Sequence, residues 1–116
     1  VIDSILGAMR KKDIGTFFPD NQKKFKNIRS PKMLKPIIEI LNNNNFYINN
    51  LDINLICEQP KVSKYRDKII KSLTNLLNID KEIINLKGKT VEKLGLIGKE
   101  KAIACEVICS ITEWKK

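Results

Sequence analysis

The residues best able to do chemistry in this sequence are gathered in the stretch Lys87–Gly98. It combines several lysines, three glycines, the hydroxyl of Thr90 and a single carboxylate, Glu92. Lysines attract an anion, and glycines allow backbone N–H groups to approach it closely. A carboxylate among such groups would repel a phosphate unless a divalent cation lay between the two. The stretch therefore indicates a phosphate site that uses a metal ion, although by itself it is equally compatible with a basic surface turn.

The overall composition favours a single folded domain with an anionic partner. The chain has 116 residues, 42% of them hydrophobic, and a formal net charge of +9. This length predicts one domain over residues 1–116, and the apolar content is sufficient for a core. The charge favours nucleotides, diphosphates, nucleic acid or acidic membrane surfaces without choosing among them. No apolar run approaches the length of about 18 residues that a membrane-spanning helix requires.

The absence of histidine excludes most acid–base, triad and zinc chemistry from the residues given. Cys57, Cys105 and Cys109 each lie in an apolar run, which favours buried free thiols in a reducing compartment. Cys105 and Cys109 could form half of a metal site, but no second cysteine pair exists to complete it. Because Val1 opens within an amphipathic helix pattern without a cap, we expect an N-terminal segment, and any targeting signal, to precede it.

The periodicity of the apolar residues predicts the elements that must position this chemistry. The expected elements are a helix over 1–11, a loop over 12–29, a helix from Ser30 to Asn45, a strand over 46–58, a helix from Ser63 to Asn78, and strands over 83–88 and 103–112. Ser30 and Ser63 are the expected N-caps, and Pro36 should kink its helix or confine it to its first turns. This order predicts an α/β sandwich of the α+β class, a mixed sheet with helices packed on one face.

Two further patterns concern packing. The apolar face of the helix after Ser63 is expected at Tyr65, Ile69, Leu73, Leu76 and Leu77. The last strand alternates regularly, but Ile108 makes its second face partly apolar as well. A strand buried on both faces in so small a domain indicates an interface, so we expect an oligomer.

Four short motifs follow one another at the spacing of one enzyme family. They are Asp13-Ile14-Gly15 with Phe18-Pro19-Asp20, Cys57-Glu58-Gln59-Pro60-Lys61, Thr90-Val91-Glu92-Lys93-Leu94-Gly95, and Ile103-Ala104-Cys105-Glu106. Over its whole length the chain resembles the 2-C-methyl-D-erythritol 2,4-cyclodiphosphate synthases of non-mevalonate isoprenoid biosynthesis. The resemblance implies a phosphorus–oxygen lyase that cyclises 4-diphosphocytidyl-2-C-methyl-D-erythritol 2-phosphate. In that reaction the 2-phosphate attacks the β-phosphate and CMP leaves.

The resemblance also implies which residues contact the substrate. They are Asp13, Gly15, Asp20, Cys57, Pro60, Lys61, Val62, Ser63, Lys89, Thr90 and Lys99. Asp13, Gly15 and Asp20 would hold the methylerythritol phosphate, although by residue type alone both aspartates favour turn capping. The residues from Cys57 to Ser63 would form the cytidine pocket, largely through backbone groups.

At the diphosphate the resemblance implies a hydrogen bond from Thr90 and a Mg²⁺ or Mn²⁺ ion on Glu92. Asp13, Thr90 and Glu92 are therefore the expected catalytic residues. Lys89 replaces a threonine of many family members. Lys99 replaces a common arginine and, with Glu106, would line a trimer axis that can hold an isoprenoid phosphate. A lysine is a poorer bidentate phosphate ligand than an arginine.

The resemblance further implies a Zn²⁺ ion, a homotrimer built around the sheets and active sites between subunits. The zinc ligands of the family, an Asp-x-His pair and a further histidine, would lie before residue 1, so we expect the chain as given to be inactive alone. No nucleic-acid or membrane partner is implied. The abundance of Lys, Asn and Ile and the Lys89-Thr90 pair favour a plastid or apicoplast stroma, with a bacterial cytoplasm as the alternative.

Two other functions remain open from the sequence. The net charge of +9 is compatible with a basic nucleic-acid-binding module, but the sequence lacks interleaved aromatic residues and a basic helix face. The absent zinc ligands are compatible with a catalytically inactive structural relative. Release of CMP from the cytidine substrate would separate the synthase from both alternatives.

Overall fold

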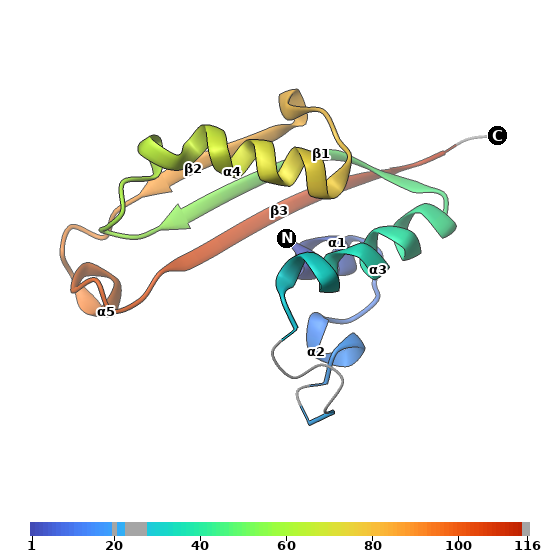
Figure 1. Cartoon of the computed structure of the whole chain (residues 1–116), viewed down its shortest axis with the longest axis horizontal. Helices are drawn as coiled ribbons and strands as arrows, with labels where there is room; N and C mark the ends of the chain where they lie inside the picture. Colours follow the sequence, from blue (N-terminus) through green and yellow to red (C-terminus); the bar gives the residue numbers. More distant parts are fainter. Residues whose placement is uncertain (20, 23–27, 115–116) are drawn as a thin grey trace. The chain divides into compact units, whose positions relative to one another are not determined.

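The computed structural model of the chain describes residues 1–19, 21–22 and 28–114 (Figure 1). In chain order its elements are α1 (Ile2–Ala8), α2 (Ile14–Phe17), α3 (Ser30–Asn43), β1 (Phe46–Ile56), α4 (Val62–Leu77), the 3₁₀ helix η2 (Lys81–Ile83), β2 (Ile84–Lys89), α5 (Gly95–Gly98) and β3 (Ala104–Glu113). The expected α+β class is confirmed: a mixed three-stranded sheet in the order β2-β1-β3, with helices packed against it. The short helices α2 and α5 fall where a loop was expected.

The two strand pairs of the sheet run in different senses. β1 and β2 are parallel, with Leu51 opposite Ile84 and Leu55 opposite Gly88. β1 and β3 are antiparallel. The start of β1 lies beside the end of β3, where the Trp114 N–H donates to the Asn45 carbonyl at 2.7 Å. A parallel pair cannot be joined by a tight turn, because the chain must return to the starting edge. Helix α4 makes that return between β1 and β2.

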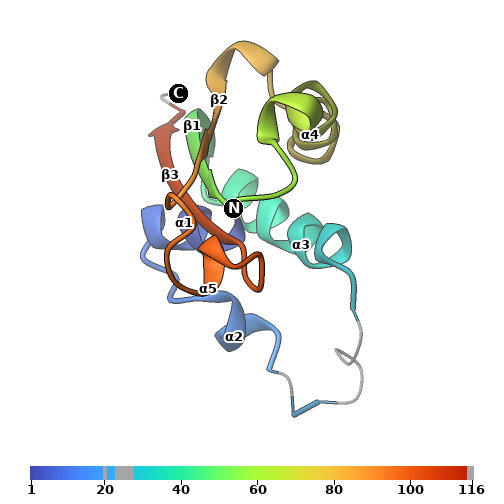
Figure 2. The same cartoon turned by 90° about the vertical axis from the view of Figure 1, so that its left-hand side faces the viewer.

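The chain forms two compact units, one of Val1–Asn50 with Cys109–Lys116 and the other of Leu51–Ile108. In the first unit α1 packs against α3 (Figure 2). Ile5 and Ile37 are fully buried there. The Asp3 carboxylate accepts a hydrogen bond from the Ile14 N–H at 2.8 Å, which ties the start of α2 to α1.

Helix α3 tolerates its internal proline. Of the two expected effects of Pro36, a kink or confinement of the helix to its first turns, the second is excluded, because α3 continues to Asn43. Pro36 lies on the exposed side of the helix, where water can satisfy the carbonyl that loses its N–H partner. The helix begins at Ser30, one residue earlier than expected, so Arg29 rather than Ser30 is its N-cap. Asn45 has the expected left-handed backbone, with φ at 62°.

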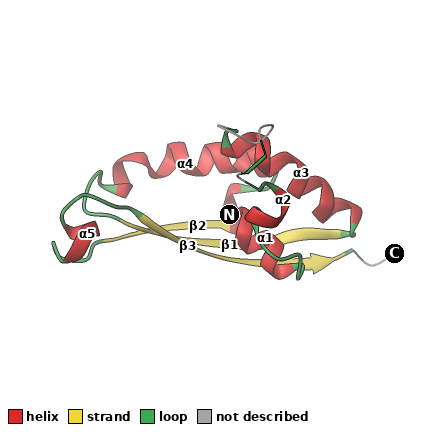
Figure 3. Cartoon of the chain, turned by 90° about the horizontal axis from the view of Figure 1, so that it is seen from below, coloured by secondary structure: helices red, strands yellow, loops and turns green. Residues whose placement is uncertain are grey.

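In the second unit α4 packs along β2 (Figure 3). Its buried residues are Ile70 and Leu77, whereas Tyr65 and Leu76 are 38% and 40% exposed. The expected apolar face is thus correct at Leu77 and partly buried at Ile69 and Leu73, but wrong at Tyr65 and Leu76, and it missed Ile70. Several apolar residues ring α4, and periodicity alone could not decide which of them meets the strand.

The N-cap expected for α4 is also wrong. The helix begins at Val62 with Lys61 as its N-cap residue, so Ser63 lies inside the first turn. The end is as expected, because Asn78 adopts a left-handed backbone with φ at 54° and closes the helix.

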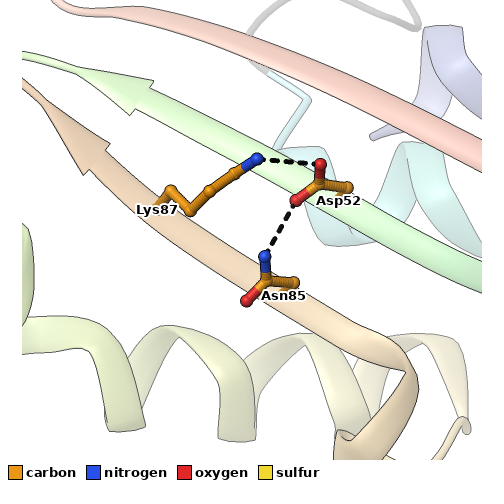
Figure 4. A network of polar contacts seen from close by, with 3 residues as sticks. All are labelled: Asp52, Asn85 and Lys87. Atoms are coloured by element: carbon orange, nitrogen blue, oxygen red, sulfur yellow. Dashed lines mark hydrogen bonds and ion pairs between the residues drawn. The ribbon is translucent and has the colours of Figure 1, made fainter.

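A polar network joins the two parallel strands on the surface of the sheet (Figure 4). Lys87 Nζ lies 3.0 Å from Asp52 Oδ2, and Asn85 Nδ2 donates to Asp52 Oδ1 at 3.2 Å. The hydrogen bond from Lys87 is the largest influence on this carboxyl group and lowers the pKa of Asp52 below its ordinary value of 3.8. Burial opposes that shift.

This network predicts a small acid-sensitive contribution to stability. Because the pKa of Asp52 is lower in the folded state, its stabilisation is present above pH 3.8 and is lost as the pH falls through the folded-state value. We expect Asp52→Asn to reduce the fall in melting temperature between pH 6 and pH 3, as measured by circular dichroism. If the melting temperature of Asp52→Asn fell as much as that of wild type over this pH range, the Asp52 carboxylate would not be the source of the acid-sensitive stability.

Candidate functional site

A pocket opens where the carboxyl ends of the parallel strands β1 and β2 meet the start of α4. Its lining residues are Cys57, Glu58, Gln59, Lys61, Val62, Ser63, Arg66, Leu86, Gly88, Lys89 and Thr90. Its volume, about 430 Å³, is within the usual range for small-molecule sites. In open sheets with parallel strands, ligands commonly bind at the carboxyl ends of those strands.

Gly88 explains how strand and helix come close enough to form this pocket. A Cβ atom at position 88 would lie 2.7 Å from the Val62 Cβ, which is closer than real Cβ contacts allow. The residue opposite Gly88 on β1 is Leu55. The strand pairing continues past β1, because the Cys57 N–H donates to the Lys89 carbonyl at 3.0 Å.

Two contacts shape the loop that follows β2. The Glu58 carboxylate oxygen Oε1 accepts hydrogen bonds from the Val91 N–H at 3.0 Å and the Lys93 N–H at 2.9 Å. Further on, a Cβ atom at Gly98 would lie 2.1 Å from the Lys93 carbonyl carbon. Only glycine fits there, so the backbone of α5 lies directly on the start of the loop.

The pocket carries more positive than negative side chains. Lys61 and Lys89 are exposed at its rim, and Arg66 Nε donates to the Leu86 carbonyl at 3.3 Å inside it. Glu58 is the carboxylate of the lining, and its Oε1 atom is occupied by the two loop N–H groups. The arrangement suits an anionic ligand whose charge lies near the lysines.

The structure brings together most of the residues expected at a cytidine diphosphate. Cys57, Lys61, Val62, Ser63, Lys89 and Thr90 line the one pocket. Pro60 lies at its edge, where its carbonyl accepts from Cys57 Sγ at 3.5 Å. The expected substrate-binding residues did not include Glu58, Gln59, Arg66, Leu86 or Gly88, which also line the pocket. Glu58, Gln59 and Gly88 lay in stretches already singled out, but no pattern in the sequence pairs Glu58 with residues 91 and 93.

The other expected site residues lie elsewhere. Glu92 is exposed two residues beyond Thr90, and Lys99 is the C-cap of α5. Asp13 and Gly15 belong to the other compact unit, and Asp20 lies outside the described residues. Asp13 caps α2 by accepting from the N–H and the hydroxyl of Thr16, at 3.1 and 2.8 Å.

The chemistry of the side chains decides which metal ions fit. Within residues 1–19, 21–22 and 28–114, no three His, Cys, Asp or Glu side chains are grouped closely enough to hold a metal ion. These residues therefore do not fit zinc. Glu92 fits a magnesium ion, which commonly binds to one or two carboxylates together with substrate phosphates and water.

The cysteines are free thiols, and one of them differs from expectation. Cys57 is buried, and burial raises the pKa of the half-buried Cys109 thiol. The expectation that all three are buried is wrong for Cys105, which is exposed. Cys105 lies on β3, an outer strand of the sheet. Ile108 on the same strand is 74% exposed, so the second apolar face expected there has no cover within the described chain.

A second and larger groove, of about 770 Å³, lies along α4, η2 and the start of β2. Its lining includes Arg66 and residues of both charges, such as Lys71 and Asp80. Of the residues expected to bind substrate, none belongs to its lining. The smaller pocket is therefore the better candidate despite its size.

Over the part of the chain that is described, no helix has the length and apolar content needed to cross a membrane.

Comparison with known proteins gives consistent matches. A model of the YgbB family matches residues 1–112. The chain is 54% identical to the bifunctional enzyme IspD/IspF of Pelagibacter ubique, over 96% of this chain and 30% of that protein. It is 49% identical to the apicoplast 2-C-methyl-D-erythritol 2,4-cyclodiphosphate synthase of Plasmodium falciparum, over 90% of this chain and 44% of that protein. The chain thus spans less than half the length of these two relatives.

A solved structure extends the similarity to the fold. The chain superposes on the CDP complex of IspF from Plasmodium falciparum with a TM-score of 0.84 and 43% sequence identity. The match covers 99% of this chain and 68% of that one. The expected resemblance is confirmed by these matches.

Proposed function

The chain belongs to the YgbB family, and we propose that the protein is a 2-C-methyl-D-erythritol 2,4-cyclodiphosphate synthase. It would convert 4-diphosphocytidyl-2-C-methyl-D-erythritol 2-phosphate to the cyclic diphosphate and CMP. One observation carries the proposal: the residues expected at the cytidine and at the diphosphate line a single pocket. They are Cys57, Lys61, Val62, Ser63, Lys89 and Thr90. The similarity to a structure described as a CDP complex supports it.

In this proposal the pocket binds and orients the nucleotide. Backbone groups between Cys57 and Ser63 hold the cytosine and ribose. Thr90 donates its hydroxyl hydrogen to the diphosphate, and Lys61 and Lys89 lie at the rim to balance its charge. Holding the 2-phosphate in line with the β-phosphorus can contribute about 7–11 kcal/mol, because the two groups no longer need to find each other.

Glu92 would hold a Mg²⁺ or Mn²⁺ ion at the diphosphate. When bound, such an ion withdraws negative charge from phosphate oxygens and so favours both attack and departure of CMP. The zinc ion of the family does not fit the described residues, so no step is assigned to it here.

The remaining assignments are proposed on the resemblance alone. Asp13 and Gly15, with Asp20, would bind the methylerythritol phosphate. Lys99 and Glu106 would face a trimer axis. Ile103 and Ile108 are exposed apolar side chains. Their exposure supports a homotrimer in which other copies of the chain bury them. Since relatives occur in a bacterium and in an apicoplast, both compartments are possible, and we propose a plastid-type organelle.

The direct test uses the full-length protein with the cytidine diphosphate substrate, zinc and magnesium. We expect CMP and the cyclic diphosphate to form in equal amounts, followed by chromatography and phosphorus NMR. The residues 1–116 alone should give little or no turnover. Absence of CMP from the full-length protein under every metal condition would sink the proposal.

A further inference from the structure

We infer that Glu58 is a positioning residue, which fixes the loop carrying Thr90 and Glu92 onto the end of the cytidine pocket. The inference rests on the proposed function for its catalytic consequence. Its structural part rests on the hydrogen bonds of one carboxylate. Glu58 follows β1 directly, whereas the loop that it holds follows β2.

The geometry is that of an anchor between two segments distant in sequence. One oxygen, Glu58 Oε1, accepts from the N–H groups of both Val91 and Lys93. These two residues flank Glu92, whose backbone is left-handed with φ at 52°, as is that of Lys93 at 66°. Non-glycine residues rarely adopt this conformation unless surrounding contacts hold them there. The carboxylate supplies two such contacts.

The same bonds determine how an anion can be bound. The glycines of this stretch led to the expectation that backbone N–H groups approach a phosphate. The Val91 and Lys93 N–H groups already point at Glu58, so they are not available to a ligand. The Cys57 N–H is likewise used, by the Lys89 carbonyl. The Val91 and Lys93 N–H groups therefore do not bind the diphosphate, and we assign its recognition to Thr90, the lysines and a cation on Glu92.

Glu58 is half-buried and belongs to the pocket lining, so its charge lies close to any bound anion. A carboxylate in that position would oppose binding if it faced the ligand uncompensated. Two charge-assisted hydrogen bonds explain its presence, because a hydrogen bond to an ionised group is about twice as strong as a neutral one. The residue thus contributes through the loop and not through contact with the substrate.

The test compares Glu58→Ala and Glu58→Gln in the full-length protein, with Glu39→Ala as control. Glu39 is an exposed glutamate on α3 that has no role in the proposed machinery. Glutamine keeps an acceptor oxygen at the same position, whereas alanine removes it. We expect Glu58→Ala to lower kcat/KM about tenfold, with Glu58→Gln restoring most of the activity and Glu39→Ala matching wild type.

Two binding and exchange measurements separate positioning from substrate contact. CDP should bind about tenfold more weakly to Glu58→Ala, whereas CMP, which lacks the β-phosphate, should change by less than about twofold. Amide hydrogen exchange should accelerate in the segment 90–98 of Glu58→Ala but not of Glu58→Gln. These measurements report on Glu58 even if the wild-type protein releases no CMP, which would refute only the proposed function.

Several outcomes would overturn the inference. Unchanged exchange in the segment 90–98 of Glu58→Ala would show that the carboxylate does not hold the loop. Equal losses of CMP and CDP affinity would assign Glu58 to the base pocket instead. If the wild-type protein is active and Glu58→Ala is equally active, the position of the loop held by Glu58 does not affect catalysis.

Discussion

Replacing Gly98 with alanine should abolish most of the activity of the full-length protein. A Cβ atom at this position would lie 2.1 Å from the carbonyl carbon of Lys93 and 2.7 Å from its Cα and oxygen atoms. These are backbone atoms, so no side-chain rotation can relieve the overlap. The loop that carries Thr90 and Glu92 must shift, and a displacement of about 1 Å at a reacting group can cost about 100-fold in rate.

The effect of Gly98→Ala should be separable from simple unfolding. Overpacking of this kind costs about 1–3 kcal/mol, so the melting temperature should fall while the sheet remains folded. Gly7→Ala is the matched control, because its Cβ would meet nothing within 4 Å and alanine is favoured over glycine inside a helix. If Gly98→Ala retained both the wild-type melting temperature and the wild-type kcat/KM, the assigned packing of the loop would be wrong.

Replacing Glu92 with glutamine should lower kcat/KM about 100-fold and flatten its response to magnesium. The change removes the negative charge while keeping nearly the same shape, and losing one group that stabilises the transition state typically costs about 100- to 1000-fold. Titration of the activity with Mg²⁺ and Mn²⁺ measures this directly. Calorimetric binding of CDP should likewise lose its enhancement by magnesium.

Glu100→Gln provides the control for Glu92→Gln. Both residues are exposed glutamates with a left-handed backbone, at φ of 52° for Glu92 and 63° for Glu100. Glu100→Gln removes the same charge close to Glu92 in the sequence and leaves the proposed cation ligand, Glu92 itself, unchanged. A Glu92→Gln protein whose activity rises with magnesium as steeply as that of wild type would refute the role of Glu92.

Local patterns in the sequence predicted most of the elements. Alternation located β1 and β3, and the left-handed Asn78 ended α4 as expected, whereas the C-cap of α3 is Asn44 and the left-handed Asn45 follows it. Two errors have a common cause. The buried face of α4 and the exposure of Cys105 both depend on which neighbour lies beside the residue, and periodicity does not identify that neighbour.

The candidate site divides in the same way. The family resemblance assigned residues in the segments 57–63 and 89–90 to one nucleotide, and all of these residues except Pro60 line one pocket. The sequence gave no reason to connect Glu58 with residues 91 and 93, because the contact spans more than thirty positions and forms only when the parallel strands align. For Asp13 and Gly15, in the other compact unit, the expected role remains a prediction.

The sequence by itself determined the family, the fold class and the chemical character of the stretch Lys87–Gly98. Those properties follow from residue types at fixed local spacing, which the chain carries whether or not it is folded. The tertiary structure alone decided what the glycines and the backbone N–H groups of that stretch do. Gly88 and Gly98 allow the chain to pack against itself, and the Val91 and Lys93 N–H groups bind Glu58 and not a ligand. The physical reason is that a hydrogen-bond donor takes the nearest well-oriented acceptor, and only folding brings the Glu58 carboxylate within 3.0 Å of that loop.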